Sequence, residues 1–388
     1  MSLPSSGIRR RVTVGCGILL TLLASLPVNA GQDPEAGGER RRVQGELKRY
    51  HGIINAYREG KDDAVDEILD WDPERLKRIV AAAQSSDDVF RPWDAPRTRA
   101  ATMLHTDAAM RLMDREPDRV SFQLEMAAQL VQMAGPDLHP FARTWYIAVS
   151  RSLRDRALLF VDEGFLERGR KHLPGDPTVL YESGVLQEQI ATFAAFITET
   201  LVSTPPPFSR GPGANLTSMG SFSGSEATRN IQERTRALDR AYGWLRDSIR
   251  ADAASELAQL HIGRVQVLRG NDAEGVKFLE RLTSSADTDS AYLATIFIGA
   301  MHQRRGRHDQ AEQLYRRAIE KVPTAQAAYV ALSDALQKLG RGDESRAVLI
   351  DLLSHPPGSR TEPWWWYLAE PVGEARERLD ALRAAVRQ

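Results

Sequence analysis

The chain has 388 residues and a formal net charge of −1, with 42% hydrophobic and 27% charged residues. This composition is typical of a folded, soluble protein, and the balanced charge gives no bulk attraction to nucleic acid or anionic lipid. The length allows either two globular domains or one elongated array of repeats. We therefore expect no nucleic-acid partner, and the pattern along the chain must decide the architecture.

Residues 1–30 are predicted to be a secretory signal peptide. Three arginines at positions 9–11 precede a mostly apolar run over residues 12–26, and Val28-Asn29-Ala30 fits the small-residue pattern before a cleavage site. The apolar run is shorter than the roughly 20 residues of a membrane-spanning helix, so we expect cleavage after Ala30 instead of anchoring. The sequence thus predicts an exported protein of bacterial type, periplasmic or extracellular, without a stable membrane anchor after cleavage.

Cleavage would also change the chemistry of the chain. It removes three arginines and no acidic residue, which lowers the net charge from −1 to −4. It also removes Cys16, the single cysteine, which lies inside the apolar run and not after it, as a lipid-attachment cysteine would. A mature chain without cysteine has no disulfide, thiolate zinc ligand or cysteine nucleophile. We expect its stability to come from packing.

The segment after the signal divides into a polar start and a long helical region. Residues 31–42 are polar and glycine-rich, which predicts a flexible leader. Over residues 43–250, apolar residues recur at spacings of three and four, which predicts irregular antiparallel helix pairs. Residues 203–227 interrupt this pattern with prolines, glycines and serines. Because helix-helix connections usually have about 2–8 residues, this inserted loop is expected to be either mobile or functional.

The clearest repeat lies in Ala291–Pro323, which has the pattern of two helices joined by a turn. Gly306 of this unit and Gly340 of the next have the same separation in the sequence as Pro323 and Pro357. Small residues recur where two paired helices would cross, with Gly299 and Ala311 in this unit and Ser333 and Ser345 in the next. A preceding unit begins after residue 250, so residues 251–357 are predicted to hold three repeats.

This pattern resembles the tetratricopeptide repeat, which has a matching period of about 34 residues and small residues at its helix crossings. The resemblance implies an all-α fold, a right-handed α-solenoid of antiparallel helix pairs, with looser pairs on the N-terminal side. An open array exposes an apolar end that needs a cover. We therefore expect residues 358–388, with the run Trp364–Tyr367 and a final helix, to form a C-terminal capping segment.

The resemblance further implies that the first helix of each pair lines a concave groove that binds a protein or peptide. Some relatives hold terminal carboxylates with lysine and asparagine there, but Ile296, Ala300, Val330 and Asp334 occupy those positions here. A carboxylate clamp is therefore not expected, and an extended or helical protein segment fits better. The predicted partner-binding residues are Leu260, Arg264, Ile296, Gln303, Arg304, Val330, Asp334, Gln337 and Lys338.

Motifs for catalysis were sought as an alternative. The chain has no H-E-x-x-H, phosphate-binding glycine loop or dinucleotide fingerprint, and the G-S-F-S-G stretch at Gly220–Gly224 carries Phe222 where a hydrolase has its serine. We predict no catalytic residue, no cofactor and no metal site. The preferred hypothesis is an exported, non-catalytic scaffold. The alternative is an all-helical secreted hydrolase acting on carbohydrate or peptide through two inward carboxylates.

Overall fold

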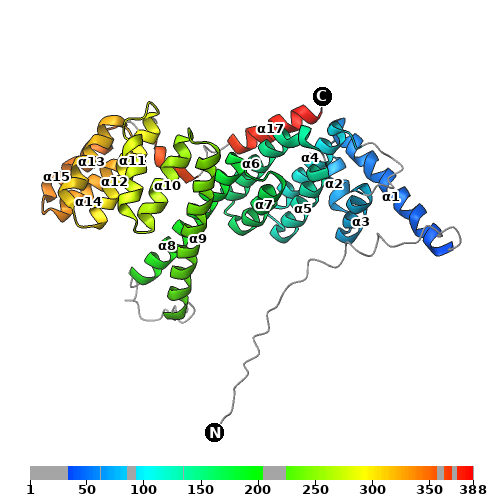
Figure 1. The fold of residues 1–388 in the computed structure, drawn as a ribbon, viewed down its shortest axis with the longest axis horizontal. Coiled ribbons are helices and arrows are strands. Elements are labelled where there is room, and N and C mark those ends of the chain that lie inside the picture. The colour runs from blue at the N-terminus through cyan, green and yellow to red at the C-terminus, as the bar shows by residue number, and fades with distance from the viewer. Residues whose placement is uncertain are drawn as a thin grey trace, which may run out of the picture.

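The computed structural model describes residues 34–61, 63–84, 93–133, 135–203, 224–355, 362–368 and 374–387. Throughout these ranges the regular structure is α-helix, apart from one short 3₁₀ helix, and no strand occurs. Successive helices pack in pairs along an elongated array, as Figure 1 shows, which confirms the predicted all-α solenoid. None of the helices in these ranges has the length and hydropathy that crossing a membrane requires. The predicted signal peptide lies outside the described residues.

The N-terminal half consists of irregular pairs. α4 packs on α5, α6 on α7 and α8 on α9, while α1, α2 and α3 pack against α4 and α5. Trp145, Tyr146 and Phe165 form an aromatic cluster between α6 and α7. The bounds are α1 (Pro34–Arg58), α2 (Asp63–Leu69), α3 (Pro73–Gln84), α4 (Ala95–Leu112), α5 (Pro117–Met133), η1 (Pro136–Leu138), α6 (His139–Asp155), α7 (Leu159–His172), α8 (Pro177–Ser203) and α9 (Gly224–Ala251).

Two N-terminal boundaries differ from the prediction. α1 begins at Pro34, so the leader expected over residues 31–42 is helical from that point. Leu47, later in the same helix, is 3% exposed and packs in the core, and Arg42 pairs with Glu46 one turn later. The polar residues before position 43 therefore extend a helix whose later part is buried in the core. α9 begins at Gly224, inside the loop expected over residues 203–227. Residues 204–223 of that loop lie outside the described residues.

The three regular pairs follow in the order expected for residues 251–357. Their turns share one geometry: Gly270, Gly306 and Gly340 have φ of 87°, 71° and 76°, a conformation that glycine adopts without the strain of a side chain. In each turn the next backbone N–H donates to the carbonyl five residues earlier, as a Schellman motif requires. The helices are α10 (Glu256–Leu268), α11 (Asp272–Leu282), α12 (Thr288–Arg304), α13 (His308–Lys321), α14 (Gln326–Lys338) and α15 (Gly342–Ser354).

Small residues allow the paired helices to approach closely. A Cβ on Gly299 would lie 2.6 Å from Cε1 of Tyr315 on the partner helix, which is closer than packed atoms come. In the last pair, Ser333 and Ser345 meet at the same crossing, and their hydroxyl oxygens are 2.8 Å apart in a buried hydrogen bond. The serines therefore replace the smaller residues of the pattern by satisfying each other's polar groups.

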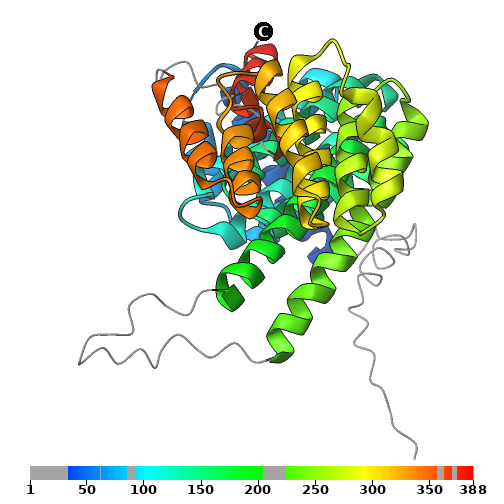
Figure 2. The ribbon, with the colours of Figure 1, turned by 90° about the vertical axis from the view of Figure 1, so that its left-hand side faces the viewer.

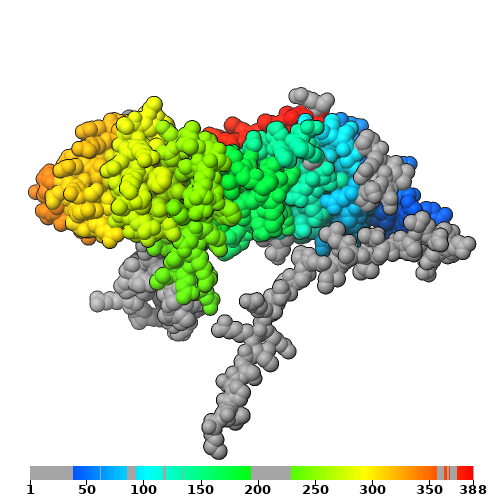
Figure 3. All heavy atoms as spheres, in the orientation of Figure 1, coloured from blue at the N-terminus to red at the C-terminus, as the bar shows by residue number. Residues whose placement is uncertain are grey.

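The C-terminal segment does not cap the array. α16 (Pro363–Leu368) packs on α8 and α12, and α17 (Glu374–Val386) packs on α6 and α4, far from α15. Figures 1 and 3 show α17, in red, along the N-terminal half of the molecule. Its apolar side chains Leu379, Leu382 and Val386 join the core of that half. The capping prediction is thus wrong, because the apolar stripe of α17 is buried between helices of the N-terminal pairs instead of at the end of the array.

α8 and α9 are longer than the other paired helices, with bounds Pro177–Ser203 and Gly224–Ala251. They extend together beyond the rest of the array, as the view in Figure 2 shows most clearly. The pair thus projects from the middle of the solenoid, between the irregular and the regular repeats.

Candidate functional site

The predicted groove corresponds to the first helices of successive pairs, and we call the side formed by α4, α6, α8, α10, α12 and α14 the first-helix face. α16 lies on this face over α8, α10 and α12. The Tyr367 hydroxyl donates to Glu188 Oε1 on α8 at 2.8 Å, and Glu188 also contacts Nδ1 of His261 at 2.7 Å and Nη1 of Arg264 at 2.5 Å. One buried carboxylate thus joins three helices.

Charge compensation explains why Glu188 can be fully buried. Burial alone would raise the pKa of its carboxyl, but the charge of Arg264 and the hydrogen bonds from His261 and Tyr367 outweigh this effect and hold the pKa below its usual range. An ionised carboxylate without these partners would be very costly in a protein interior. The Glu188 cluster, which we define as Glu188, His261, Arg264 and Tyr367, is therefore a structural unit that requires α16.

Aromatic rings complete the contact of α16 with the face. Tyr367 stacks on His261 with ring centroids 4.1 Å apart and an interplanar angle of 15°. The Arg264 guanidinium lies 5.0–5.3 Å from the ring centroids of Phe297, Trp364 and Tyr367, within cation–π range. Trp364 and Tyr367, expected in a cap, therefore fill the middle of the first-helix face.

A second carboxylate extends this contact toward α14. Glu362, just before α16, is 4% exposed and accepts from the Tyr292 hydroxyl at 3.3 Å and from the Ala327 backbone N–H at 2.7 Å. The Ala327 N–H lies in the first turn of α14, where helix N–H groups have no partner within the helix. The chain's own segment therefore demonstrates what this face accepts: aromatic side chains and a carboxylate.

Three of the predicted groove residues are buried within the molecule. Leu260 and Ile296 are 0% and 6% exposed and belong to the apolar cluster that contains Tyr367, and Arg264 is 8% exposed in the Glu188 cluster. The structure does not expose these three side chains to a partner, because the chain itself buries them. The sequence signal for this was the aromatic run at positions 364–367, although nothing in the sequence linked it to Glu188 or His261.

The other six predicted residues remain accessible at the C-terminal end of the face. Val330 is 56% exposed, and Gln303 is half-buried, accepting from the Tyr315 hydroxyl at 2.6 Å and donating to Asp334. Arg304, Asp334, Gln337 and Lys338 are exposed. We call Gln303, Arg304, Val330, Asp334, Gln337 and Lys338 the open site. It combines one apolar side chain with amide and charged groups.

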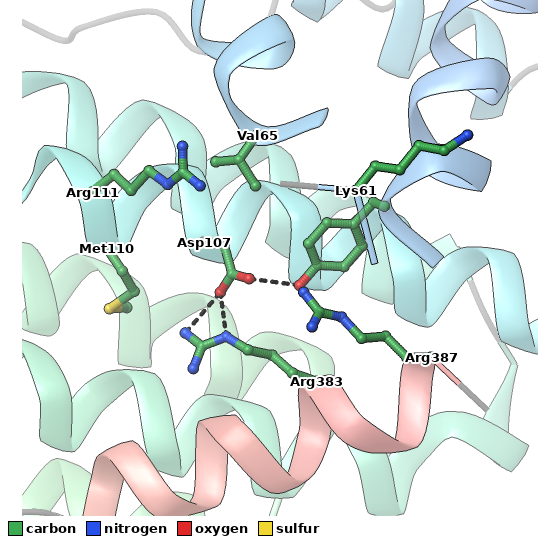
Figure 4. A pocket seen from close by; sticks show the side chains of 8 residues that line it. Lys61, Val65, Asp107, Met110, Arg111, Arg383 and Arg387 are labelled. Atoms are coloured by element: carbon green, nitrogen blue, oxygen red, sulfur yellow. Dashed lines mark hydrogen bonds and ion pairs between the residues drawn. The ribbon is translucent and has the colours of Figure 1, made fainter. Parts of the chain in front are cut away.

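At the other end of the face, α17 is fastened by a polar cluster. Asp107 on α4 accepts from the Tyr57 hydroxyl at 2.6 Å and from Arg383 Nε at 2.8 Å (Figure 4). Burial and the neighbouring Asp107 carboxylate raise the pKa of Tyr57, so this phenol stays protonated and donates. α1, α4 and α17 are thereby joined through one carboxylate.

A hollow of about 330 Å³ beside Asp107 is lined by four cationic side chains. Lys61 pairs with Glu59, Arg111 with Asp66 and Arg383 with both Asp107 and Asp380. Arg387 lies over the Tyr57 ring, 5.8 Å from its centroid. Carboxylates already form ion pairs with three of the four cations. The hollow therefore belongs mainly to the packing interface between α17 and the N-terminal helix pairs. Its lining residues are Tyr57, Lys61, Val65, Asp107, Met110, Arg111, Arg383 and Arg387.

Two buried carboxylates bear on the hydrolase alternative. Burial raises the pKa of Asp162 to about 7 against the opposing charge of Arg154, whereas two arginines hold the pKa of Glu182 below its usual range despite burial. Such divergent values are typical of an acid–base pair. However, Asp162 and Glu182 are 0% and 1% exposed, and Arg154 lies against both. A substrate cannot reach them here, so they serve packing.

In the part of the chain that the structure describes, no three histidine, cysteine, aspartate or glutamate side chains converge in a way that could hold a metal ion. The buried or half-buried carboxylates of Glu188, Asp107 and Asp162 each lie within ion-pair distance of an arginine. Ion pairing thus accounts for the charge clusters of this region.

Comparison with known proteins supports the repeat pattern. Residues 303–364 match the family model described as tetratricopeptide repeat. This part of the chain contains tetratricopeptide repeats. The matched region covers α13, α14 and α15 and ends in α16, so it includes the open site. No curated protein sequence matches the chain.

Several solved structures are similar to this chain at low sequence identity. MamA (residue 41 to its end) from Desulfovibrio magneticus RS-1 is 12% identical, with a TM-score of 0.36 over 55% of this chain and 93% of that one. A human IFIT1 dimer with m7Gppp-AAAA is 11% identical, with a TM-score of 0.34 over 76% and 67%. The Cut9–Hcn1 tetramer of the APC/C is 13% identical, with a TM-score of 0.21 over 89% and 71%. The helix pairs of the chain itself carry the fold assignment.

Proposed function

We propose that this protein is an exported, non-catalytic scaffold that binds a segment of a partner protein at the open site. One observation carries the proposal. Ile296 and Val330 occupy the same position in successive repeats. Ile296 is 6% exposed and belongs to the apolar cluster that contains Tyr367 of α16, whereas Val330 is 56% exposed. The same repeat position is therefore buried within the molecule in one repeat and accessible in the next.

The covered part of the face supports this proposal by example. There, a short segment is bound through aromatic packing, a hydroxyl-to-carboxylate bond and a contact with a helix N-terminus. α14 continues the same face one repeat further, with polar groups around Val330. A partner segment would bury Val330 and exchange hydrogen bonds with these groups, which is how interfaces combine an apolar centre with a polar rim.

Site-directed crosslinking tests the proposal. A photoreactive amino acid at Gln337, in the open site, should form an adduct with one partner protein in extracts of the producing organism, whereas the same group at Arg346 on the outer helix α15 should not. Val330→Asp should abolish the Gln337 adduct, because it places a charge in the contact. Equal adducts from both positions, or an adduct unaffected by Val330→Asp, would refute the open site as the binding surface.

Export rests on residues 1–30 and needs its own test. N-terminal sequencing of the protein recovered from the envelope and the culture medium should give a chain beginning at Gly31. A chain retained in the cytoplasm with residues 1–30 intact would overturn export, while the binding proposal would stand independently.

A further inference from the structure

We infer that the partner segment at the open site is extended and acidic, with two carboxylates about three residues apart. The inference rests on the proposed function and names the chemistry of its partner. It follows from the charge and the repeat geometry of the open site.

Two cations recur at the same repeat position of the open site. Arg304 and Lys338 lie one repeat apart, each in the last turn of a first helix, and both are exposed. Across the described ranges neither has a carboxylate within ion-pair distance, whereas the neighbouring Arg305 pairs with Asp272 at 2.7 Å. Arg304 donates a long hydrogen bond, 3.4 Å from Nη2 to the Val267 carbonyl oxygen. Two cations without an ion-pair partner in the described ranges thus stand on successive repeats.

The surroundings of Arg304 add to this positive charge. Its pKa is lowered first by burial and then, against the opposing effect of Asp272, by the charges of Arg234, Arg264 and Arg305. Arg234, on α9, likewise has no carboxylate partner among the residues described. The nearest acid within the open site, Asp334, already accepts from Gln303. A ligand with negative charge would relieve the repulsion around Arg304.

The spacing of the helices sets the spacing of the ligand's charges. α12 and α14 are neighbouring first helices in contact, and packed helix axes lie about 8–10 Å apart. An extended chain in the polyproline II conformation advances about 3.1 Å per residue with about three residues per turn, so side chains at i and i+3 point to the same side about 9 Å apart. Carboxylates three residues apart could therefore meet Arg304 and Lys338 together. Between these two carboxylates, an apolar side chain of the partner segment would pack on Val330. The Gln337 amide would form a hydrogen bond with the backbone of that segment.

Selection from a random library tests this chemistry without knowledge of the natural partner. Phage-displayed twelve-residue peptides would be selected on the full chain and on the variant Arg304→Gln/Lys338→Gln. The matched control Lys277→Gln/Arg346→Gln removes the same charges from outer helices, where both side chains are exposed. We expect peptides with aspartate or glutamate at i and i+3 from the unmodified chain and the control. Binding of those peptides should fall at least fivefold in the open-site variant, and raised salt should weaken it.

The outcomes separate the inference from the proposed function. The selected peptides could lack acidic pairs and yet fail to bind the Val330→Asp variant. That result would overturn the acidic partner and retain the open site as a protein-binding surface. Acidic peptides that bind the open-site variant and the unmodified chain equally would overturn the inference as well. If Val330→Asp enriches the same peptides as the unmodified chain, the proposed function also fails. A labelled ten-nucleotide polyuridine whose binding depends on Arg304 and Lys338, when no peptide does, would reassign the site to nucleic acid.

Discussion

The attachment of α16 to the first-helix face can be tested by changing Tyr367 in two steps. Tyr367→Phe removes only the hydroxyl that donates to Glu188 at 2.8 Å. Tyr367→Ala also removes a ring that is 6% exposed and stacked on His261. The two variants thus separate the polar from the apolar part of the attachment, and they leave the three regular repeats unchanged.

The structure gives the size of each effect. A hydrogen bond to a charged group contributes about 1.5–3 kcal/mol, and since Glu188 keeps His261 and Arg264, Tyr367→Phe should cost about 1.5 kcal/mol. Removing a buried aromatic ring costs about 3–5 kcal/mol. Because about 1.4 kcal/mol corresponds to a factor of ten, local opening of α16 should become about tenfold more frequent in Tyr367→Phe and about a thousandfold more frequent in Tyr367→Ala.

Hydrogen exchange followed by mass spectrometry measures this opening directly in peptides that cover α16. Tyr329→Phe is a suitable control, because its hydroxyl donates to the Pro323 carbonyl oxygen at 3.1 Å outside the α16 contact. That variant should leave exchange in α16 unchanged. If Tyr367→Ala exchanged in α16 at the rate of the unmodified chain, the Glu188 cluster would not be what holds α16, and the reasoning would be refuted.

Three further outcomes are expected from chemical denaturation. Gly299→Ala should lower the free energy of unfolding by about 1–3 kcal/mol, because the added Cβ overpacks the helix crossing. The control Gly164→Ala, whose Cβ would meet no atom within 4 Å, should raise it by up to about 1 kcal/mol. Equal effects of the two variants would contradict the crossing geometry. Burial lowers the pKa of His105 from 6.5 to about 4, so only the unfolded chain binds this proton between those values. Stability should therefore fall by about 3 kcal/mol as the pH drops from 6.5 to 4, and less so in His105→Gln. Arg383→Gln should cost about 1–3 kcal/mol and increase exchange in α17, because Asp107 loses its cation; unchanged exchange would show that apolar packing alone holds α17.

Much of the fold follows from local sequence rules. Gly270, Gly306 and Gly340 take the left-handed backbone that ends each first helix, at the turns that the repeat pattern predicts. Gly299 meets Tyr315 at the crossing where a small residue was predicted. These features depend on contacts within one repeat or between neighbouring repeats, so the pattern of a short stretch contains them.

The site was only partly predictable. Repeat position alone assigned nine residues to one groove, and it treated Ile296 and Val330 alike because they are equivalent in the repeat. Their exposure differs because Ile296 lies in the apolar cluster that α16 joins, whereas Val330 does not; α16 follows all three regular repeats in the chain and packs back on α12. Periodicity carries no information about such a contact.

The sequence by itself therefore determined the helix pairs, their turns and the face that their first helices share. Only the tertiary structure decided how much of that face is free. The Tyr367 hydroxyl contacts Glu188, 179 positions away, and Arg383 contacts Asp107, 276 positions away. Each of these pairings depends on one buried carboxylate meeting its donors in space, and such complementarity leaves no periodic trace in the sequence.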